Sequence, residues 1–416
     1  MREFKININH ATTIISILYI NNAFFGFIKD ITILNAFCLL CMVLWFIIAS
    51  KEPGFLRNCI NVCFPLIVYT IFLILAYFIT GANMSSGLWQ SLRNTFFSLI
   101  CSFLCLHIMT QDGMFKHKVL TFLLANVLLG CVYTLYRIQE NPYLPRILAK
   151  GSTGVETLLG GNVNTAGIIT YGGIYGMTLI IPTFVYWISL RQGQKKILPL
   201  AVTIIIIVTI FQAQFSIALI FSIVGIVLYL ILCGRKSNYR YILSSLFIIV
   251  TVLVVINWDS VLYAVYSAGI LPSVLQQKAH ELLLYSGGGN LTGTNLYFRS
   301  TYYAQSFKAI VQNNFVGKVF SNHASGAGHS EWEDMAANYG IIAPILVFAF
   351  FRNFTKKISK YFDEKMITVY RIQLLIFFII GFIDPIFHSR TMSYLMFLSP
   401  LILTMFNNVN IERTEA

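Results

Sequence analysis

Charged side chains are scarce in this chain of 416 residues. Aspartate, glutamate, lysine and arginine together make up 11% of it, while 57% is hydrophobic and the mean hydropathy is +0.73. A soluble globular protein carries about 25% charged residues. This deficit of charge excludes an ordinary soluble domain and predicts a polytopic membrane protein. The first apolar run has no small-residue cleavage site and another run follows at once, so we expect no cleaved signal peptide.

Patterns that bind metals or nucleotides are missing as well. The chain has no Asp-x-Asp motif, no Walker loop and no dinucleotide fingerprint. Its eight cysteines fall in or beside apolar runs, which is typical of small buried apolar residues rather than of metal ligands or disulfides. We therefore expect no metal and no other cofactor. The energy for any reaction must then come from the substrate or from a gradient.

Apolar runs long enough to cross a bilayer are what the chain has in abundance, since about 20 helical residues span the hydrocarbon core. They predict an all-α integral membrane protein with about 12 transmembrane helices and one large outer loop that contains short helices. Residues 1–258 would hold nine spans and a small outer loop at about 137–162, residues 259–332 the large loop, and residues 333–416 the last three spans and a cytoplasmic C-terminus. The predicted spans lie near residues 11–28, 31–50, 60–80, 92–110, 118–136, 165–189, 198–213, 215–233, 240–258, 333–351, 368–385 and 392–408.

The distribution of lysine and arginine sets the expected orientation. With the N-terminus in the cytoplasm, 19 of the 29 basic residues fall in inner segments and ten in the longer outer segments. This is the bias that the positive-inside rule requires. Most of the net charge of +13 is therefore assigned to residues that face anionic lipid, and we expect no nucleic-acid partner.

Arginines on the outer side form the first candidate group. A guanidinium presents a planar fork of donors suited to phosphate and keeps its charge. Each one alone is most simply a structural ion pair or a headgroup contact, but as a group on the side with fewer cations they suggest an anionic substrate. They are Arg93, Arg137, Arg146, Arg299 and Arg390.

Arg299 also begins a segment, residues 299–313, whose pattern predicts an amphipathic helix. Tyr303, Phe307 and Ile310 would share one face of it at i, i+4 and i+7. This helix would lie in the large outer loop.

The segment HSEWEDMAANYG, residues 329–340, is the densest polar cluster at a predicted membrane boundary, where such clusters are costly and usually functional. His329 can take up a proton near neutral pH and so can activate a hydroxyl. His323, six residues upstream, is an alternative base. Three carboxylates could orient the ring of His329 or raise its pKa: Glu331, Glu333 and Asp334.

A glycine-rich stretch, GGNVNTAGIITYGG, begins the sixth predicted span. Asn162 and Asn164 in it could hydrogen-bond a sugar, or one of them could cap the helix.

Together these features resemble the O-antigen polymerase and ligase family of bacterial envelope assembly. In that family a large periplasmic loop ends in a His-Asn-aromatic-Leu motif followed by a glycine, before the last spans. Here His329, Trp332 and Gly340 match, whereas Ser330 stands for the usual Asn and Glu333 for the usual Leu.

Two further family features bear on the resemblance. Arg299 matches an arginine that opens a helix about thirty residues before the histidine, and residues 161–164 are similar to an asparagine-containing start of a middle span. The family's Ser-Arg pair at the start of a middle span is missing, so Arg137 or Arg146 is a candidate to replace it.

The resemblance implies a metal-independent glycosyltransferase of the bacterial inner membrane whose active site faces the periplasm. It would be an O-antigen polymerase that joins undecaprenyl-pyrophosphate-linked oligosaccharide repeat units into long polysaccharide. Its partners would be this lipid-linked oligosaccharide, membrane lipid and a chain-length regulator protein. His329 and Arg299 would be catalytic, and the substrate would contact Arg93, Arg137, Arg146, Asn164, Tyr303, Glu331, Glu333, Asp334 and Arg390.

Two alternatives remain at this point. An O-antigen ligase, which transfers polysaccharide to the lipid A core, shares the fold and the donor. A lipid-linked oligosaccharide flippase or transporter belongs to a different class; flippases usually lack a large outer loop and place charges within their spans.

Overall fold

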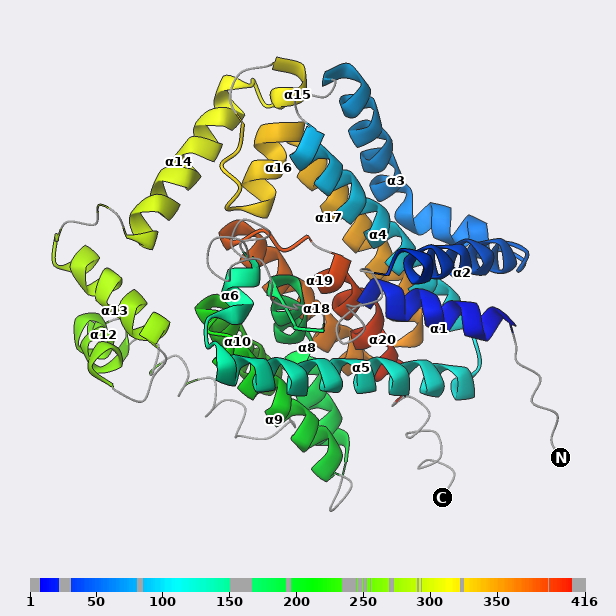
Figure 1. The fold of residues 1–416 in the computed structure, drawn as a ribbon, viewed down its shortest axis with the longest axis horizontal. Helices are drawn as coiled ribbons and strands as arrows, with labels where there is room; N and C mark the ends of the chain where they lie inside the picture. Colours follow the sequence, from blue (N-terminus) through cyan, green and yellow to red (C-terminus); the bar gives the residue numbers. More distant parts are fainter. Residues whose placement is uncertain are drawn as a thin grey trace.

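The regular structure of this protein, in the part that the computed structural model describes, is helical throughout (Figure 1). This confirms the predicted all-α class. The described residues are 8–21, 31–80, 85–149, 167–191, 196–233, 245, 249, 253–254, 256–268, 273–289, 292, 294–321, 325–387 and 389–405.

Seven of the described helices are long and apolar enough to cross a membrane, which supports a multi-pass membrane protein. These are α2 (Thr32–Ser50), α3 (Phe55–Thr80), α4 (Ser85–Thr110), α5 (Gly113–Glu140), α8 (Tyr171–Leu190), α10 (Ser216–Cys233) and α18 (Glu364–Ile383). Shorter apolar helices are α1 (Ile8–Asn21), α9 (Ile197–Gln212), and the continuous run of α19 (Ser389–Ser393), η5 (Tyr394–Leu398) and α20 (Ser399–Met405). The count of twelve spans stays a prediction, and the predicted span 240–258 lies largely outside the described residues.

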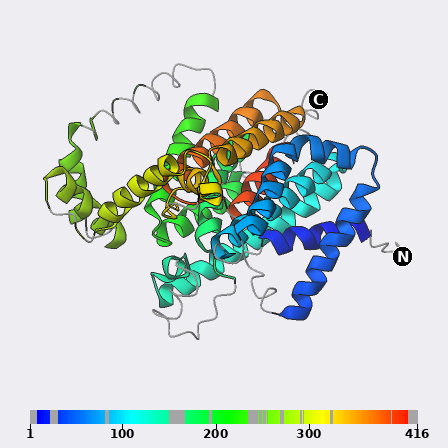
Figure 2. The same ribbon diagram turned by 90° about the horizontal axis from the view of Figure 1, so that it is seen from above.

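Helix α8 occupies the centre of the bundle, as Figures 1 and 2 show. It is buried on nearly all sides, as expected for a helix that is apolar all round. Gly176 allows this packing, because the ring of Tyr394 occupies the space that a Cβ at this position would need. In contrast, α2 and α3 expose large apolar side chains such as Ile33 and Phe78, which suits a surface that faces lipid.

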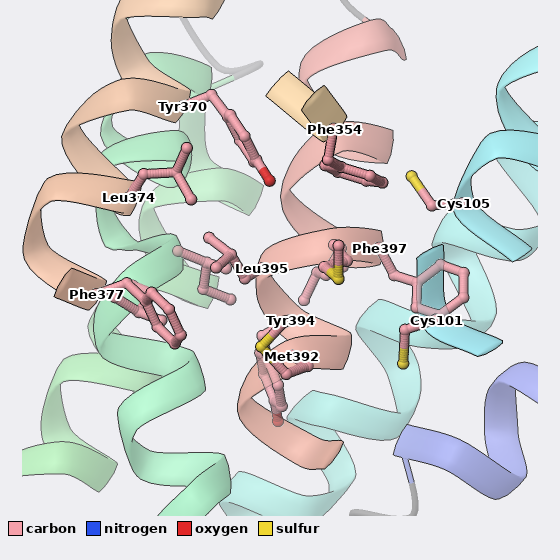
Figure 3. Close-up of a cluster of buried hydrophobic side chains, with 14 of the residues drawn as sticks. Cys101, Cys105, Phe354, Tyr370, Leu374, Phe377, Met392, Tyr394, Leu395 and Phe397 are labelled. Atoms are coloured by element: carbon pink, nitrogen blue, oxygen red, sulfur yellow. The ribbon is translucent and has the colours of Figure 1, made fainter. Parts of the chain in front are cut away.

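The core around the last helices combines aromatic and sulfur-containing side chains. Figure 3 shows the η5 segment with Tyr394, Leu395 and Phe397 lying between α18 on one side and α4, with Cys101 and Cys105, on the other. All eight cysteines are buried and free.

The region predicted as the large outer loop is mostly helical. α12 and α13 lie at one edge of the molecule, and α14 runs from them toward α15 and α16 (Figure 1). The bounds are α12 (Trp258–Ser267), α13 (Ser273–Ser286), α14 (Asn295–Gln312), α15 (Lys318–Ser321) and α16 (Glu331–Tyr339).

The predicted span 333–351 is divided in the structure, which corrects that boundary. α16 ends at Tyr339 and α17 (Ile342–Ile358) begins after a break. Gly340 makes the break, because its φ of +83° lies in the left-handed region and a Cβ there would come within 2.6 Å of the carbonyl oxygen of Val316. The three carboxylates of the polar cluster therefore belong to a separate short helix that begins at Glu331, directly after His329 and Ser330.

Two side-chain hydrogen bonds connect helices at opposite ends of the described bundle. At one end the Tyr339 hydroxyl donates to Ser91 Oγ at 3.0 Å, and at the other Lys357 Nζ donates to Asn58 Oδ1 at 2.8 Å. The first pair joins segments that the positive-inside rule assigns to the outside, and the second joins segments assigned to the inside. The packing is therefore compatible with the predicted alternation of spans.

We expect reporter fusions at Gly288 and at the C-terminus to report opposite sides of the membrane, because 19 basic residues fall in the predicted inner segments and ten in the outer ones. An alkaline phosphatase fusion should be active only at Gly288, and a cytoplasmic fluorescent reporter only at the C-terminus. If both positions report the same side, this topology is wrong.

Candidate functional site

The candidate site is built along one face of α14. Thr294 caps this helix by accepting a hydrogen bond from the backbone N–H of Tyr297 at 3.2 Å, so α14 begins one turn before Arg299. Arg299, Tyr303 and Ser306 then recur at helical spacing and share a face.

The predicted apolar face of this helix is partly wrong. Phe307 is 66% exposed, whereas Ser306, Ala309 and Asn313 are buried. The reason is that polar side chains on the buried stripe bond to the α16 region; Asn313, for example, donates to the carbonyl of Ala337 at 3.0 Å.

Arg299 joins α14 to the C-terminal end of α18. Its Nη2 lies 2.8 Å from Oδ1 of Asp384, and its Nη1 donates to the carbonyl of Ile383 at 3.3 Å. The hydroxyl of Tyr303 donates to the same carbonyl at 2.9 Å. α18 ends there, ahead of Pro385, so this carbonyl has no helical partner and accepts from side chains instead.

Asp384 is a site residue that the sequence analysis missed. It is buried, and its second carboxylate oxygen accepts a hydrogen bond from the hydroxyl of Tyr175 in α8. A buried carboxylate needs such partners to offset its desolvation. The signal in the sequence was a lone aspartate before Pro385 in an otherwise apolar run.

Two more cations lie within electrostatic range of Arg299. Arg146 is in α6 (Leu144–Ala149), and burial followed by the charge of Arg299 lowers its pKa. Burial and the charges of Arg299 and Arg146 lower the pKa of Lys278, in α13, to about 8. Lys278 also donates to Ser216 Oγ at 2.7 Å.

The three cations Arg146, Lys278 and Arg299 thus come from three different segments of the predicted outer loops. Asp384 and Glu281 are the carboxylates that raise the pKa of Lys278 and so partly offset the positive charge around it. The excess of positive charge favours an anionic ligand. The sequence analysis had grouped Arg146 with Arg299 among five outer arginines and had not singled out Lys278.

His329 lies beside this group. Its ring stacks on Tyr302 of α14 with centroids 4.2 Å apart and an interplanar angle of 8°, one turn of helix from Arg299. The side chain is partly exposed, and neither ring nitrogen has a hydrogen bond within the described chain. Tyr302, which the sequence analysis did not single out, therefore orients the ring.

The expectation that neighbouring carboxylates could raise the pKa of His329 holds for the effect of Asp334 but not for the net shift. Burial and then the charge of Arg299 lower this pKa below its ordinary value of 6.5, and together they outweigh the opposing effect of Asp334. The lowered pKa favours the neutral imidazole, which is the form that accepts a proton.

The carboxylates after His329 occupy the first turn of α16, where the helix dipole favours negative charge. Ser330 caps this helix by accepting from the N–H of Glu333 at 3.4 Å. Asp334 accepts from Ser306 Oγ at 2.6 Å, which holds α16 to α14, and its other oxygen accepts from the Ser330 N–H at 2.8 Å at the start of α16 itself.

Glu331 and Glu333 differ from Asp334 in their surroundings. Glu331 accepts from the backbone N–H of Phe387 at 2.8 Å, and burial raises its pKa to about 7. Burial also raises the pKa of Glu333, and one of its oxygens is buried without a hydrogen bond in the described chain. Glu333 is therefore the carboxylate of this turn that is left with an unsatisfied acceptor.

Two other predicted site residues, Arg137 and Arg93, have different surroundings. Arg137 pairs with Glu140 at 2.8 Å and donates to the hydroxyl of Tyr133 at 3.2 Å, both on its own helix. Arg93 is exposed on α4. The structure does not describe Asn164, His323 or the side chain of Arg390.

Comparison with protein-family models and with curated proteins finds no match for this chain. Within the described ranges, no group of three His, Cys, Asp or Glu residues is placed to hold a metal ion. The function must therefore be argued from the arrangement of side chains at this site.

Trp332 anchors α16 against α18. Its indole N–H donates to the carbonyl of Phe378 at 2.8 Å, and the ring packs among Phe348, Phe377 and Phe378. Gly381 makes room for this contact, because a Cβ at that position would overlap the indole nitrogen.

Gly381→Ala should therefore destabilise the protein by about 1–3 kcal/mol, the usual cost of overpacking a core. The thermal unfolding temperature of the purified protein should fall. Gly87→Ala is the matched control, because a Cβ at Gly87 in α4 meets nothing within 4 Å. An unchanged unfolding temperature for Gly381→Ala would contradict this account of the α16–α18 contact.

Proposed function

We propose that this protein is a polyprenyl-pyrophosphate-dependent glycosyltransferase of the O-antigen polymerase type, acting on the periplasmic face of a bacterial inner membrane. The observation that carries the proposal is the placement of His329 beside Arg299, with Arg146 and Lys278 in electrostatic range. A neutral base and a group of cations are the two elements that this reaction requires.

The reaction joins two lipid-linked chains. A hydroxyl of the acceptor sugar attacks the anomeric carbon of the donor, and a new carbon–oxygen bond forms there. The bond from that carbon to the pyrophosphate oxygen breaks, and undecaprenyl pyrophosphate leaves with the electron pair. His329 takes the hydroxyl proton, while cations stabilise the charge that develops on the leaving oxygen.

Arg299 is suited to binding the pyrophosphate because two of its hydrogen bonds already fix the position of the guanidinium. Asp384 and the carbonyl of Ile383 each accept from one terminal nitrogen, which fixes the orientation of the guanidinium. Arginine carries five N–H donors, so donors remain for a phosphate. A donor that is positioned in advance loses little entropy when the substrate binds.

Lys278 has a complementary role in this proposal. Its pKa of about 8 leaves it protonated at pH 7, and the approach of a pyrophosphate would favour the charged form further. Arg146 and Lys278 together can take the second phosphate, in place of the Ser-Arg pair that the family has and this chain lacks.

Reconstitution of the purified protein in proteoliposomes tests this function. With undecaprenyl-pyrophosphate-linked oligosaccharide as the only substrate, a polymerase makes lipid-linked glycans of two or more repeats and releases undecaprenyl pyrophosphate. A ligase makes product only when lipid A core is added, and a flippase moves the substrate across the bilayer without forming a covalent product. Either of the last two results would overturn the proposal.

A further inference from the structure

A second candidate binding site lies at the opposite end of the bundle from His329 and Arg299. It is a groove of ≈ 330 Å³ between α5, α8, α9 and α20, within the range of about 300–1,000 Å³ typical of small-molecule sites. Figure 1 shows α5 crossing these helices along one side of the bundle. Apolar side chains that line it include Leu124, Leu128, Trp187, Val202 and Met405.

The polar lining of this groove is confined to one end. His117 and Thr121 lie near the start of α5, and Arg191 directly follows α8. Thr121 Oγ1 lies 3.2 Å from His117 Nδ1, and Nε2 of this ring has no hydrogen bond within the described chain. None of the lining residues among the described ones is acidic.

The dimensions of the groove match half of a bilayer. Its lining on α5 runs from His117 to Leu128, which at 1.5 Å per residue is about 16 Å. The hydrocarbon core of a membrane is about 30 Å thick. In the predicted topology, the groove would extend from the membrane interface, at its cationic end, to about the bilayer midplane.

We infer that this groove binds one anionic phospholipid. One acyl chain lies along α5 between Leu124 and Leu128, and the phosphate lies at Arg191 and His117. The apolar lining makes this position favourable for a hydrocarbon chain, and the guanidinium recognises a phosphate by its fork. The positive-inside rule assigns this end to the cytoplasmic leaflet, which is the anionic one. The inference does not depend on the proposed function.

Native mass spectrometry of the full-length protein, released from nanodiscs that contain equal amounts of phosphatidylglycerol and phosphatidylcholine, tests the inference. We expect one phosphatidylglycerol to be retained in preference to phosphatidylcholine. Arg191→Gln should lower its retention about tenfold, the effect of losing one hydrogen bond to a charged group. Ala125→Trp should lower retention by filling the groove while leaving Arg191 in place, because Ala125 is exposed within the groove.

Two variants serve as matched controls. Arg57→Gln removes an exposed cation from the same end of the bundle, and Val132→Trp places the same indole side chain on the exposed face of α5 beyond the groove. Both should retain phosphatidylglycerol as the unmodified protein does. Equal retention of the two lipids, equal loss in the controls, or preferential retention of added undecaprenyl phosphate would each overturn the inference.

Discussion

His329→Ala is expected to slow polymerisation by about 10²–10⁴-fold, the usual cost of losing a general base. The protein should remain folded, because the His329 side chain is partly exposed and packs by stacking on Tyr302. Cells should then carry single repeats on the lipid A core. The ladder of longer chains should be absent or reduced to faint bands. The ladder on a polysaccharide gel, normalised to the protein level, is the measurement.

Tyr302→Phe is the matched control for this result, because it keeps the aromatic stack and removes only the hydroxyl. It should leave the ladder intact. A normal ladder from His329→Ala would contradict the catalytic role and leave His323 as the next candidate base. Loss of even the single-repeat band would indicate a ligase or a flippase instead.

The dependence of the polymerisation rate on pH is a second test of His329 as the general base. Its pKa lies below 6.5 because burial and then Arg299 disfavour the imidazolium. The neutral base is therefore fully present above this pKa, and the rate should fall only when the pH drops through it. In proteoliposomes, an acid limb centred above pH 6.5 would contradict the assignment.

Arg299→Lys is expected to fail nearly as badly as Arg299→Ala, although lysine keeps the positive charge. The guanidinium donates from two nitrogens at once, to Asp384 at 2.8 Å and to the carbonyl of Ile383 at 3.3 Å, while other donors remain for the pyrophosphate. An ammonium group is a point charge and cannot reproduce this fork. Polysaccharide of long chain length should be absent from both variants.

Arg93→Lys is the control for this comparison, since it makes the same change at an exposed arginine on α4. It should produce a normal ladder. Because Arg299 also holds α14 to α18, the thermal stability of each variant must be measured alongside the ladder. Full-length polysaccharide from Arg299→Lys at a normal protein level would count against the proposed role.

Several features of this protein were predictable from local sequence. A bilayer offers no hydrogen-bond partners, so each apolar run must satisfy its own backbone as a helix, whatever its neighbours do. The break between α9 and α10 near Gln214 agrees with the boundary between the predicted runs 198–213 and 215–233, and the helix around Arg299 followed from its pattern. The polar segment beginning at His329 was recognisable because polar clusters in such a chain are rare.

Other predictions failed where local pattern and packing disagree. The span expected at 333–351 is split at Gly340, because the chain approaches Val316 too closely there for any side chain. Phe307 faces outward because the buried stripe of α14 passes instead through Ser306 and Asn313, whose hydrogen-bond partners lie in or beside α16.

The sequence by itself determined that this is an all-α membrane protein and drew attention to Arg299 and His329. Only the tertiary structure decided that Asp384 pairs with Arg299, that Lys278 joins the cations and that Tyr302 orients His329. The physical reason is the separation along the chain over which each kind of interaction acts. Hydrophobic length and helix formation act within about 20 consecutive residues, so they can be read along the chain. Asp384 is 85 positions from Arg299, and a contact at that separation exists only once α14 has packed against the end of α18.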